Sequence, residues 1–492
     1  MYSIGLDVGT SSVKALAVGD TSHVVAAAQK DYPSPLITRY PGWVERDPEQ
    51  FYTVSIDVLK QLISRLPKNS ADIGSLSISG QVDGVVAVDG SGRCVENALT
   101  WMDRRATEES SLIGQRYDDR EIYFRTGVAN DASHILPKLL WLMRTYGNRW
   151  KNVETVMPPV SYLIWRFTGK RVIDRTNASY TMVFDPFKDR WWSDIIENFH
   201  IGEDKLPELV DPLESIGQVT DPRLAENGFR KTEVLGGSGD QEAACYGANV
   251  IGGNRVLDIT GTAEPVCIAT DAPVFGSRGL LELHPHVVRG KWLLENPGIT
   301  SGGCFRWLVR DIFNYTGDGA YRQADRQAQT VNPGSDGLFF LPFMSGATYP
   351  EWNPFAKGCF IGLTAKHQRG HLARALMEGT AFVVRGTLEA TKSYGVQPDK
   401  IYACAGGAQS DTWMSIKSDI LGLPVRRTGV LEMTAYGAAM MSSDGELGDS
   451  EGDEFRPNPK KAEIYSGLYE TFNDLYHSLK NHFNRMETKR RD

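Results

Sequence analysis

A carboxylate followed by small hydroxyl residues lies near the start of the chain, between two apolar segments. Tyr2 to Asp7 and Val13 to Val18 are rich in apolar and β-branched residues, as expected of the two strands of a hairpin. The turn between them, Gly9 to Ser12, offers backbone N–H groups and hydroxyls that can hold phosphate oxygens. Asp7 ends the first strand, where its carboxylate can organise Mg²⁺ beside a phosphate. The pattern predicts a phosphate-binding hairpin, and the alternative is a structural hairpin in which Asp7 only caps the turn.

A turn of the same type recurs about 250 residues later. Arg255 to Ile259 and Pro265 to Ala269 read as strands that flank the sequence Thr-Gly-Thr-Ala at residues 260–263. This recurrence predicts two lobes of similar design, with a boundary near Ala248 to Asn254. In the alignment of the two turns, Ile259 and not Asp258 lies opposite the acid of the first turn. We therefore expect only the first turn to supply a metal-organising carboxylate.

A third candidate for chemistry is the glycine-rich segment at residues 236–244, which contains Asp240 and Gln241. Its glycines permit close approach of the backbone to a ligand, and its small residues can begin a helix at about Gln241. A carboxylate at that junction can accept the proton of an alcohol that attacks a phosphoryl group. The alternative is that Asp240 is an N-cap of the helix.

A glycine-rich turn also joins an apolar strand at Lys400 to Cys404 to a helix that we expect to end near Leu421. The turn spans residues 405–410, and the N-terminus of the helix after it favours an anion. Such a turn is weak evidence alone, because many α/β folds contain one. The turn after Asp7, the segment at residues 236–244 and this turn are three glycine-containing loops, and two of them carry an acid, Asp7 and Asp240. Together they favour a phosphate-handling site.

Composition sets the class of protein. The chain has 492 residues, which corresponds to about three domains or two large lobes. With 41% hydrophobic and 23% charged residues it is an ordinary globular sequence. The net charge of −8 argues against nucleic acid or an anionic membrane as a partner, and the tail Lys489 to Arg491 is expected to be a solvated end.

The cysteines and the apolar segments indicate the compartment. The six cysteines are far apart and form no C-x-x-C pair, which predicts small buried thiols and neither a disulfide framework nor a zinc site. No leader-like segment is recognised at the start, and no apolar run approaches the length of a membrane span. We expect a cytoplasmic protein; the sequence leaves open whether it forms a homodimer.

Helical and strand-like segments alternate along the chain, which predicts an α/β fold. A helix is expected over Pro48 to Leu66, with its start marked by Asp47, and others over Leu136 to Tyr146 and Pro158 to Phe167. Strands are expected over Ile73 to Ser79, Gly84 to Asp89 and Val234 to Gly237.

Together these segments resemble the FGGY carbohydrate kinases, over nearly the whole chain. The most specific element is Gly358-Cys359-Phe360-Ile361-Gly362-Leu363, then seven residues, then His371 to Glu378, which fits the second signature of the family. Also similar are Trp43 to Pro48, Pro137 to Trp141 and Phe340 to Phe343, although Ile135 departs from the strict first signature. The resemblance implies two actin-like ATPase lobes, of the ribonuclease H type, around a central cleft. It divides the chain into an N-terminal lobe, 1–248, with the sugar site and phosphate hairpin, and a nucleotide-binding C-terminal lobe, 249–492.

The resemblance also implies a role for each site residue, with ATP and Mg²⁺ as cofactors. Asp7 would organise the metal and Asp240 would be the general base. Contacts to the nucleotide would come from Gly9, Thr10, Ser11, Ser12, Lys14, Thr260, Gly261, Thr262, Gly406, Gly407 and Ala408. Contacts to the sugar would come from Gln81, Asp83, Trp101, Asp103 and Gln241. The alternatives left open are a solvated Lys14, core packing for Trp101, and surface charges for Arg104 and Arg105.

The identity of the substrate is less defined. Residues 80–84, Gly-Gln-Val-Asp-Gly, resemble the xylulokinase motif, but Asp83 stands where a histidine is usual. Residues 239–241, Gly-Asp-Gln, look more like glycerol kinases, although the Arg-Glu pair of those enzymes is missing after Gln81. Asp83 disfavours an acid sugar by like-charge repulsion.

We therefore expect an ATP-dependent sugar kinase that acts on a ketopentose such as xylulose or on a related neutral sugar. The alternatives are a polyol kinase for glycerol, erythritol or a pentitol, and a non-catalytic sugar-binding regulator of the same fold.

Overall fold

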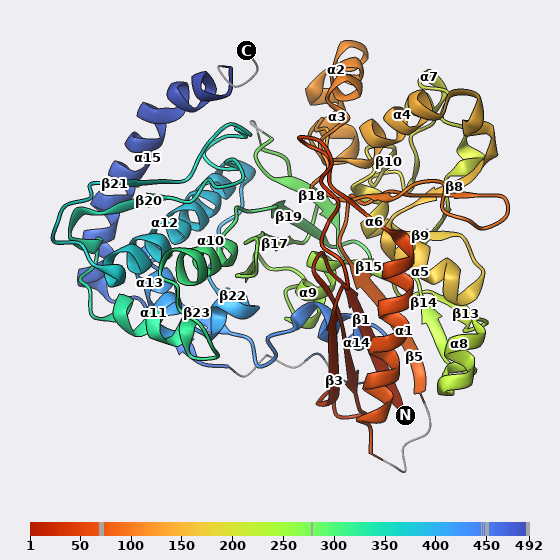
Figure 1. The fold of residues 1–492 in the computed structure, drawn as a ribbon, viewed down its shortest axis with the longest axis horizontal. Helices are drawn as coiled ribbons and strands as arrows, with labels where there is room; N and C mark the ends of the chain where they lie inside the picture. The colour runs from red at the N-terminus through yellow and green to blue at the C-terminus, as the bar shows by residue number, and fades with distance from the viewer. Residues whose placement is uncertain (68–72, 277–278, 444, 446, 448–451, 489–492) are drawn as a thin grey trace. The chain divides into compact units, whose positions relative to one another are not determined.

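The computed structural model describes residues 1–67, 73–276, 279–443, 445, 447 and 452–488. The chain divides into two compact units (Figure 1). The first unit consists of residues 1–251, 282–293 and 433–449, and the second of residues 252–281, 294–432 and 450–492. The first break, after Ile251, lies close to the boundary expected near residues 248–254. The excursions at 282–293 and 433–449 were not anticipated, and the Lys489 to Arg491 tail lies outside the described residues.

The secondary structure of the first unit alternates strands and helices, as the sequence predicts. Its strands are β1 Tyr2–Val8, β2 Ser12–Val18, β3 Val24–Asp31, β4 Glu45–Arg46, β5 Ile73–Gly80, β6 Val86–Asp89, β7 Ala98–Leu99, β8 Val153–Met157, β9 Val172–Asp174, β10 Phe184–Asp185, β11 Arg190–Trp191, β12 Glu208–Val210, β13 Ser215–Gln218, β14 Glu233–Leu235, β15 Ser238–Gly239 and β18 Glu282–Pro285. Its α-helices are α1 Pro48–Ser64, α2 Thr107–Arg116, α3 Asp119–Thr126, α4 Ile135–Tyr146, α5 Pro159–Thr168, α6 Arg175–Ser179, α7 Ser193–Asn198, α8 Pro222–Leu224, α9 Asp240–Gly247 and α14 Met433–Met440. Shorter helical turns are η1 Gly147–Asn152, η2 Glu203–Lys205 and η3 Ala225–Phe229.

The main sheet of the first unit has the strand order β13-β14-β5-β1-β2-β3, and β15 also pairs with β5. Strands β1, β5, β14 and β15 are parallel, whereas β2 runs antiparallel to β1, and β3 runs antiparallel to β2. Successive residues of a strand face opposite sides of a sheet. On one side of β1, Ile4 and Leu6 join the core that contains Phe51 of α1. On the other side, Gly5 lies against Ala435 of α14, so closely that a Cβ on Gly5 would meet the Ala435 carbonyl oxygen at 1.9 Å.

The second unit repeats this pattern of strand pairing. Its strands are β16 Val256–Ile259, β17 Val266–Thr270, β20 Phe339–Leu341, β21 Cys359–Ile361, β22 Ile401–Cys404, β23 Val425–Arg427 and β24 Glu454–Phe455, and β19 Trp292–Asn296 spans the break at residue 293. Its helices are α10 Gly302–Trp307, α11 Ala320–Gln329, α12 Arg369–Ala390, α13 Asp411–Leu421 and α15 Pro459–Thr488, with shorter turns η4 Leu308–Ile312, η5 Ser335–Gly337, η6 Thr391–Tyr394 and η7 Gly406–Gln409. β16 pairs antiparallel with β17 and parallel with β22, as β1 does with β2 and β5. The expected recurrence is therefore present in the strand pairings, and the α/β class is confirmed.

Local sequence signals set several helix ends. Asp47 accepts a hydrogen bond from the backbone N–H of Glu49, and Pro48 occupies the first turn of α1. Gly169 ends α5 with a left-handed φ of 75°. All six cysteines lie within the described residues and are free. Within the described part of the chain, no helix is both long enough and apolar enough to span a membrane.

Candidate active site

Three parallel strands of the first unit end side by side. In the register of the sheet, Gly80 of β5 lies between Val8 of β1 and Gly239 of β15. Because neighbouring strands are about 4.8 Å apart, the ends of β1 and β15 are separated by about 10 Å. The predicted residues Asp7, Gln81 and Asp240 therefore lie at one edge of the sheet, next to these strand ends.

The first turn is a true two-strand hairpin. Gly9 donates its N–H to the Ser12 carbonyl oxygen at 3.1 Å, and Asp7 lies directly opposite Lys14 in the register of β1 and β2. Directly opposed residues of an antiparallel pair project to the same face of the sheet. Asp7 and Lys14 are both half-buried. Ser11 at the tip is exposed, which leaves the turn open to a ligand.

The hairpin contacts two residues that the sequence assigns to sugar binding. Gln81 donates from Nε2 to the Gly9 carbonyl oxygen at 3.4 Å, and its backbone N–H donates to the Val8 carbonyl oxygen. The Trp101 indole N–H donates to the Thr10 hydroxyl at 2.9 Å, while 39% of the residue stays exposed. Core packing, the alternative for Trp101, is thus wrong. The structure brings the turn at residues 9–12 together with one amide and one indole face.

Asp240 is the first residue of α9, and Gly239 occupies the N-cap position. The alternative in which Asp240 is merely the N-cap is therefore wrong. The helix begins one residue earlier than expected. Gln241 follows in the first turn, and its Oε1 is buried without a hydrogen-bond partner among the described residues, as is the Oε1 of Gln81. A buried amide oxygen without a partner is costly, and a substrate hydroxyl would satisfy it.

The segment after Trp101 differs from the prediction. Asp103 is fully buried, and its carboxylate accepts hydrogen bonds from the Val44 N–H at 2.7 Å and from Arg105. Arg105 is also buried, with a side chain 1% exposed and its guanidinium over the rings of Trp43 and Trp141. The surface alternative is therefore wrong for Arg105. The oxygens of Asp103 serve an internal ion pair, and the structure offers no support for its predicted sugar contact.

Asp83 is held from two directions by one helix. His134, the N-cap residue of α4, places its Nδ1 3.0 Å from Asp83 Oδ1. Lys138 lies one turn later on the same face and donates from Nζ to the carbonyl oxygens of Asp83 and Thr100, at 2.7 and 2.8 Å. Burial lowers the pKa of Lys138 to about 8. Asp83 itself has a φ of 59°, a strained conformation for a residue with a side chain.

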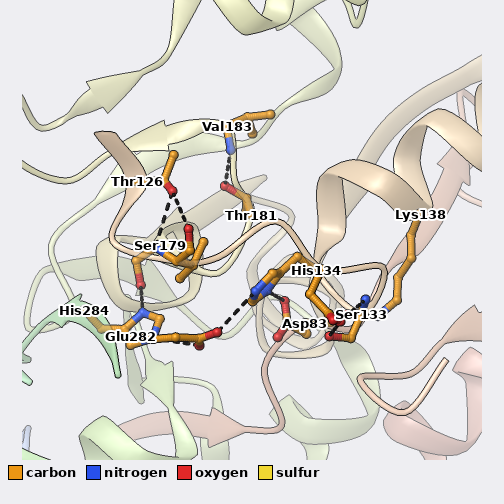
Figure 2. Close-up of polar contacts among 12 residues, drawn as sticks. Asp83, Thr126, Ser133, His134, Lys138, Ser179, Thr181, Val183, Glu282 and His284 are labelled. Atoms are coloured by element: carbon orange, nitrogen blue, oxygen red, sulfur yellow. Dashed lines mark hydrogen bonds and ion pairs between the residues drawn. The ribbon is translucent and has the colours of Figure 1, made fainter. Parts of the chain in front are cut away.

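A chain of polar contacts continues behind Asp83 (Figure 2). His134 Nε2 lies 3.4 Å from Glu282 Oε1, and the other oxygen of Glu282 lies 3.4 Å from His284 Nε2. His284 Nδ1 is 2.8 Å from the Ser179 hydroxyl of α6. We call the series Asp83, His134, Glu282, His284 and Ser179 the buried relay. Burial opposes the charged forms, but the carboxylates around His134 raise its pKa well above the usual value, and His134 in turn lowers the pKa of Glu282 to about 2.

A second route links the buried relay to α9. The ring of His284 stacks on Tyr180 with a centroid separation of 3.9 Å, and the Tyr180 hydroxyl donates to Glu242 Oε1 at 3.0 Å. Glu242 lies on α9, two residues after Asp240. Thr176 of α6 accepts a hydrogen bond from the Gly239 N–H at 2.9 Å. The Asp83 segment and the start of α9 are thus connected through buried side chains.

The pKa of His286, a buried histidine outside the relay, is shifted in the opposite direction to that of His134. His286 accepts from the Val288 N–H and contacts the Val250 carbonyl oxygen, which suits a neutral imidazole. Burial lowers its pKa to about 4. Because the unfolded chain binds this proton near pH 6.5, the contribution of His286 to stability is complete above pH 6.5 and is lost as the pH falls toward 4.

We expect His286→Gln to weaken this part of the pH dependence, which amounts to about 3 kcal/mol between pH 6.5 and 4. Denaturant unfolding at pH 7 and pH 4.5 would measure it in the wild type and the variant. An equal loss of stability on acidification in both proteins would contradict the assignment.

In the second unit, the two remaining predicted loops lie against each other. Gly407 donates its N–H to the Thr260 carbonyl oxygen at 2.9 Å, and a Cβ on Gly407 would meet the Thr260 Cγ2 at 2.4 Å. The N-terminus of α10 joins them, because Gly302 donates its N–H to the Gly261 carbonyl oxygen at 3.0 Å. Thr262 and Gly406 are exposed. This arrangement leaves a polar backbone surface formed by three segments distant in sequence.

Behind the second turn lies a fully buried ionic cluster. The ammonium of Lys417 contacts the carboxylates of Asp258 and Glu264 and donates to the Thr260 hydroxyl. All three charged side chains are 0% exposed. Burial opposes the charge of Lys417, but the two carboxylates outweigh it and raise the pKa of Lys417, whereas burial raises the pKa of Glu264 to about 7. Asp258 thus pairs with a lysine inside the unit and organises the turn from behind.

Several residues of the site were missed by the sequence reasoning. The i, i+4 spacing of His134 and Lys138 was a usable signal, because such residues share a helix face. No local signal marks Glu282 or His284, which contact segments more than 100 residues away. Glu264 and Lys417 are likewise 153 residues apart.

The side chains at the site could bind Mg²⁺ only together with phosphate oxygens of a bound ligand. Among the described residues, no group of three or more His, Cys, Asp or Glu side chains could hold a metal ion. Mg²⁺ is commonly bound by one or two carboxylates together with substrate phosphates. Asp7 beside the phosphate turn fits that pattern.

Comparison with known proteins supports the resemblance that the sequence shows to carbohydrate kinases. The N-terminal domain of the FGGY family of carbohydrate kinases matches residues 2–247, and its C-terminal domain matches residues 258–443. A xylulose kinase of Bacillus subtilis (strain 168) is 25% identical over 96% of both chains. A glycerol kinase of Rhodospirillum centenum is 31% identical, covering 89% of this chain and 88% of its own.

A solved structure agrees closely. The xylulose kinase from Rhodospirillum rubrum superimposes with a TM-score of 0.87 at 29% identity, covering 98% of this chain and all of that one. The fold, the two matched domains and the relatives confirm the resemblance drawn from the signature at residues 358–378. The chain belongs to the FGGY family of carbohydrate kinases.

Proposed function

We propose that the protein transfers the γ-phosphate of ATP to a hydroxyl of a ketopentose such as xylulose, or of a related neutral sugar. The observation that carries this proposal is the common edge formed by the ends of β1, β5 and β15, which gathers Asp7, Gln81 and Asp240. The xylulose kinases among the relatives support the substrate class.

Each group at this edge has a chemical role in the proposal. The Asp240 carboxylate accepts the proton of the attacking hydroxyl. Gln81 and Gln241 offer buried amide oxygens to other hydroxyls, and the exposed Trp101 ring covers an apolar C–H face. Asp7 and the turn at residues 9–12 hold the phosphates, with Lys14 beside them.

The nucleotide is proposed to contact the backbone of residues 260–262 and 406–408 as well. Asp7 together with phosphate oxygens would hold Mg²⁺, which when bound neutralises charge on the transferred group. We also propose a cytoplasmic location and a division of the chain into lobes between residues 248 and 249.

A polyol kinase is the second candidate. Glycerol kinases are among the relatives, and residues 239–241 share the Gly-Asp-Gln sequence that resembles theirs. A non-catalytic regulator is a third possibility that the same experiment addresses.

The test is ADP release from ATP and Mg²⁺, measured with and without a panel of pentuloses, pentitols, tetritols and glycerol. We expect release to depend on one of these compounds, with xylulose or another pentulose the most effective. A pentitol, tetritol or glycerol as the best acceptor would select the polyol kinase. Hydrolysis that no sugar stimulates, or no hydrolysis at all, would overturn the proposal.

A further inference from the structure

The conformation of Asp83 is fixed by three independent constraints. Its backbone is left-handed, with a φ of 59°. Its carbonyl oxygen accepts the ammonium hydrogen bond of Lys138 at 2.7 Å, and its Oδ1 lies 3.0 Å from His134 Nδ1. Strain of this kind persists only where the surroundings enforce it, and it concentrates at ligand sites. The structure thus fixes both the backbone and the carboxylate of this residue.

The second carboxylate oxygen of Asp83, Oδ2, is available to a ligand. Oδ2 has no hydrogen-bond partner among the described residues, and the side chain keeps 12% of its surface exposed. Asp83 follows Gln81, whose Nε2 contacts the phosphate turn at Gly9. The unused oxygen therefore belongs to the short segment that enters the proposed sugar site after β5.

His134 is itself held from behind. Its Nδ1 faces Asp83, its Nε2 faces Glu282, and Glu282 is held in turn by His284. An imidazole between two carboxylates can donate from both nitrogens, so it cannot rotate without losing a contact. The side chain is 3% exposed, which excludes water as a ready substitute.

From this arrangement we propose that His134 is a positioning residue for substrate recognition: it aims Asp83 so that Oδ2 accepts a hydrogen bond from one hydroxyl of the sugar. This inference rests on the proposed function and specifies which chemical group of the sugar the subsite recognises. An ionised carboxylate only accepts hydrogen bonds, whereas an imidazole can donate one. The group facing Asp83 must therefore be a hydroxyl, and a carbonyl oxygen or carboxylate at that position is rejected.

The same geometry accounts for the departure from the xylulokinase-like motif. That motif has a histidine where this chain has Asp83. Here the imidazole comes from α4 and stands behind the aspartate, and the aspartate occupies the position next to Gln81. The pair thus presents a carboxylate where the motif presents an imidazole.

Two substitutions of His134 separate its two contacts. An asparagine amide nitrogen is as many bonds from Cβ as Nδ1, so His134→Asn can still donate to Asp83. A glutamine amide nitrogen is as many bonds from Cβ as Nε2, so His134→Gln keeps the Glu282 side and loses Asp83. His286→Gln is the matched control, because His286 is a buried histidine of the same unit that contacts Val250 and not Asp83.

The measurement is steady-state kinetics with the panel compound that the wild type phosphorylates best, together with the midpoint of thermal unfolding. We expect His134→Gln to raise the sugar KM about 10- to 100-fold, the loss typical of a hydrogen bond to a charged group. The KM for ATP should change by less than about twofold, because the nucleotide contacts proposed above do not include Asp83. His134→Asn and His286→Gln should stay near the wild-type sugar KM.

A double variant tests the mechanism. Since His134 acts through Asp83, adding His134→Gln to Asp83→Asn should raise the sugar KM no further than Asp83→Asn alone. Additive effects would overturn the inference, as would a wild-type sugar KM in His134→Gln or an equal loss in His134→Asn. If His134→Gln does not fold, Asp83→Asn and His134→Asn decide the question. Failure of the wild type to phosphorylate any sugar would instead overturn the proposed function.

Discussion

Replacing Asp240 by asparagine is expected to lower kcat for sugar phosphorylation by about 10²- to 10⁴-fold, the usual contribution of a general base. Asparagine has nearly the shape of aspartate but cannot accept the proton of the attacking hydroxyl. Asp240 begins α9 and does not cap it, so the helix should persist in the variant. Coupled measurement of ADP release with the best sugar would give the rate, and nucleotide titration would show that ATP still binds.

Asp57→Asn is a suitable control for this experiment. Asp57 lies in the same unit and pairs with Lys30 on the surface, where both side chains are more than 40% exposed. Its replacement should leave kcat unchanged. Near-normal turnover by Asp240→Asn would remove Asp240 from the role of base and point to another proton acceptor at the same sheet edge.

The second large effect is expected on stability. Lys417→Met should destabilise the second unit by about 3–5 kcal/mol, because it leaves the carboxylates of Asp258 and Glu264 buried without their cation. It also removes the hydrogen bond that Lys417 donates to the Thr260 hydroxyl. We expect a lower midpoint of thermal unfolding, and a higher KM for ATP in the protein that remains folded.

The comparison that isolates charge from packing is a triple variant, Lys417→Met with Asp258→Asn and Glu264→Gln. Replacing the whole set by neutral groups should recover much of the lost stability, because no unpaired charge is left buried. Lys30→Met serves as the surface control and should change stability by less than about 1 kcal/mol. An unfolding midpoint of Lys417→Met equal to that of the wild type would show that the cluster is energetically neutral.

The sequence predicted local structure well where short signals act within one element. The start of α1 at Pro48 followed from Asp47, and the end of α5 from Gly169. Strand limits were less accurate, because pairing with neighbours decides them: β6 begins at Val86, two residues later than expected. The long helix α15 was not anticipated.

In the candidate site, too, local features could be predicted from the sequence, whereas contacts between distant segments could not. The hairpin at Asp7 and the turn before α9 could be recognised because their chemistry is contained in a few consecutive residues. The sugar contact predicted for Asp103 has no support in the structure, because the carboxylate of Asp103 pairs with the buried Arg105. The partners of Asp83 and Asp258 could not be found, because they depend on where distant segments fold. Family resemblance identified the fold through residues 358–378 but carried no information on these contacts.

The route of the chain has a consequence for how the first unit is made. Glu282, which holds His134, and α14, which covers Gly5, both come from segments that follow the first stretch of the second unit. During synthesis at about 5–20 residues per second, residues 1–251 are therefore complete about 10 to 40 seconds before α14 has been synthesised. A nascent chain of that length has Asp7, Asp83 and Asp240 but lacks the helix that covers β1 and the carboxylate behind His134. We expect competence to bind sugar to appear late in translation, after residue 440, and not when the first 251 residues have left the ribosome.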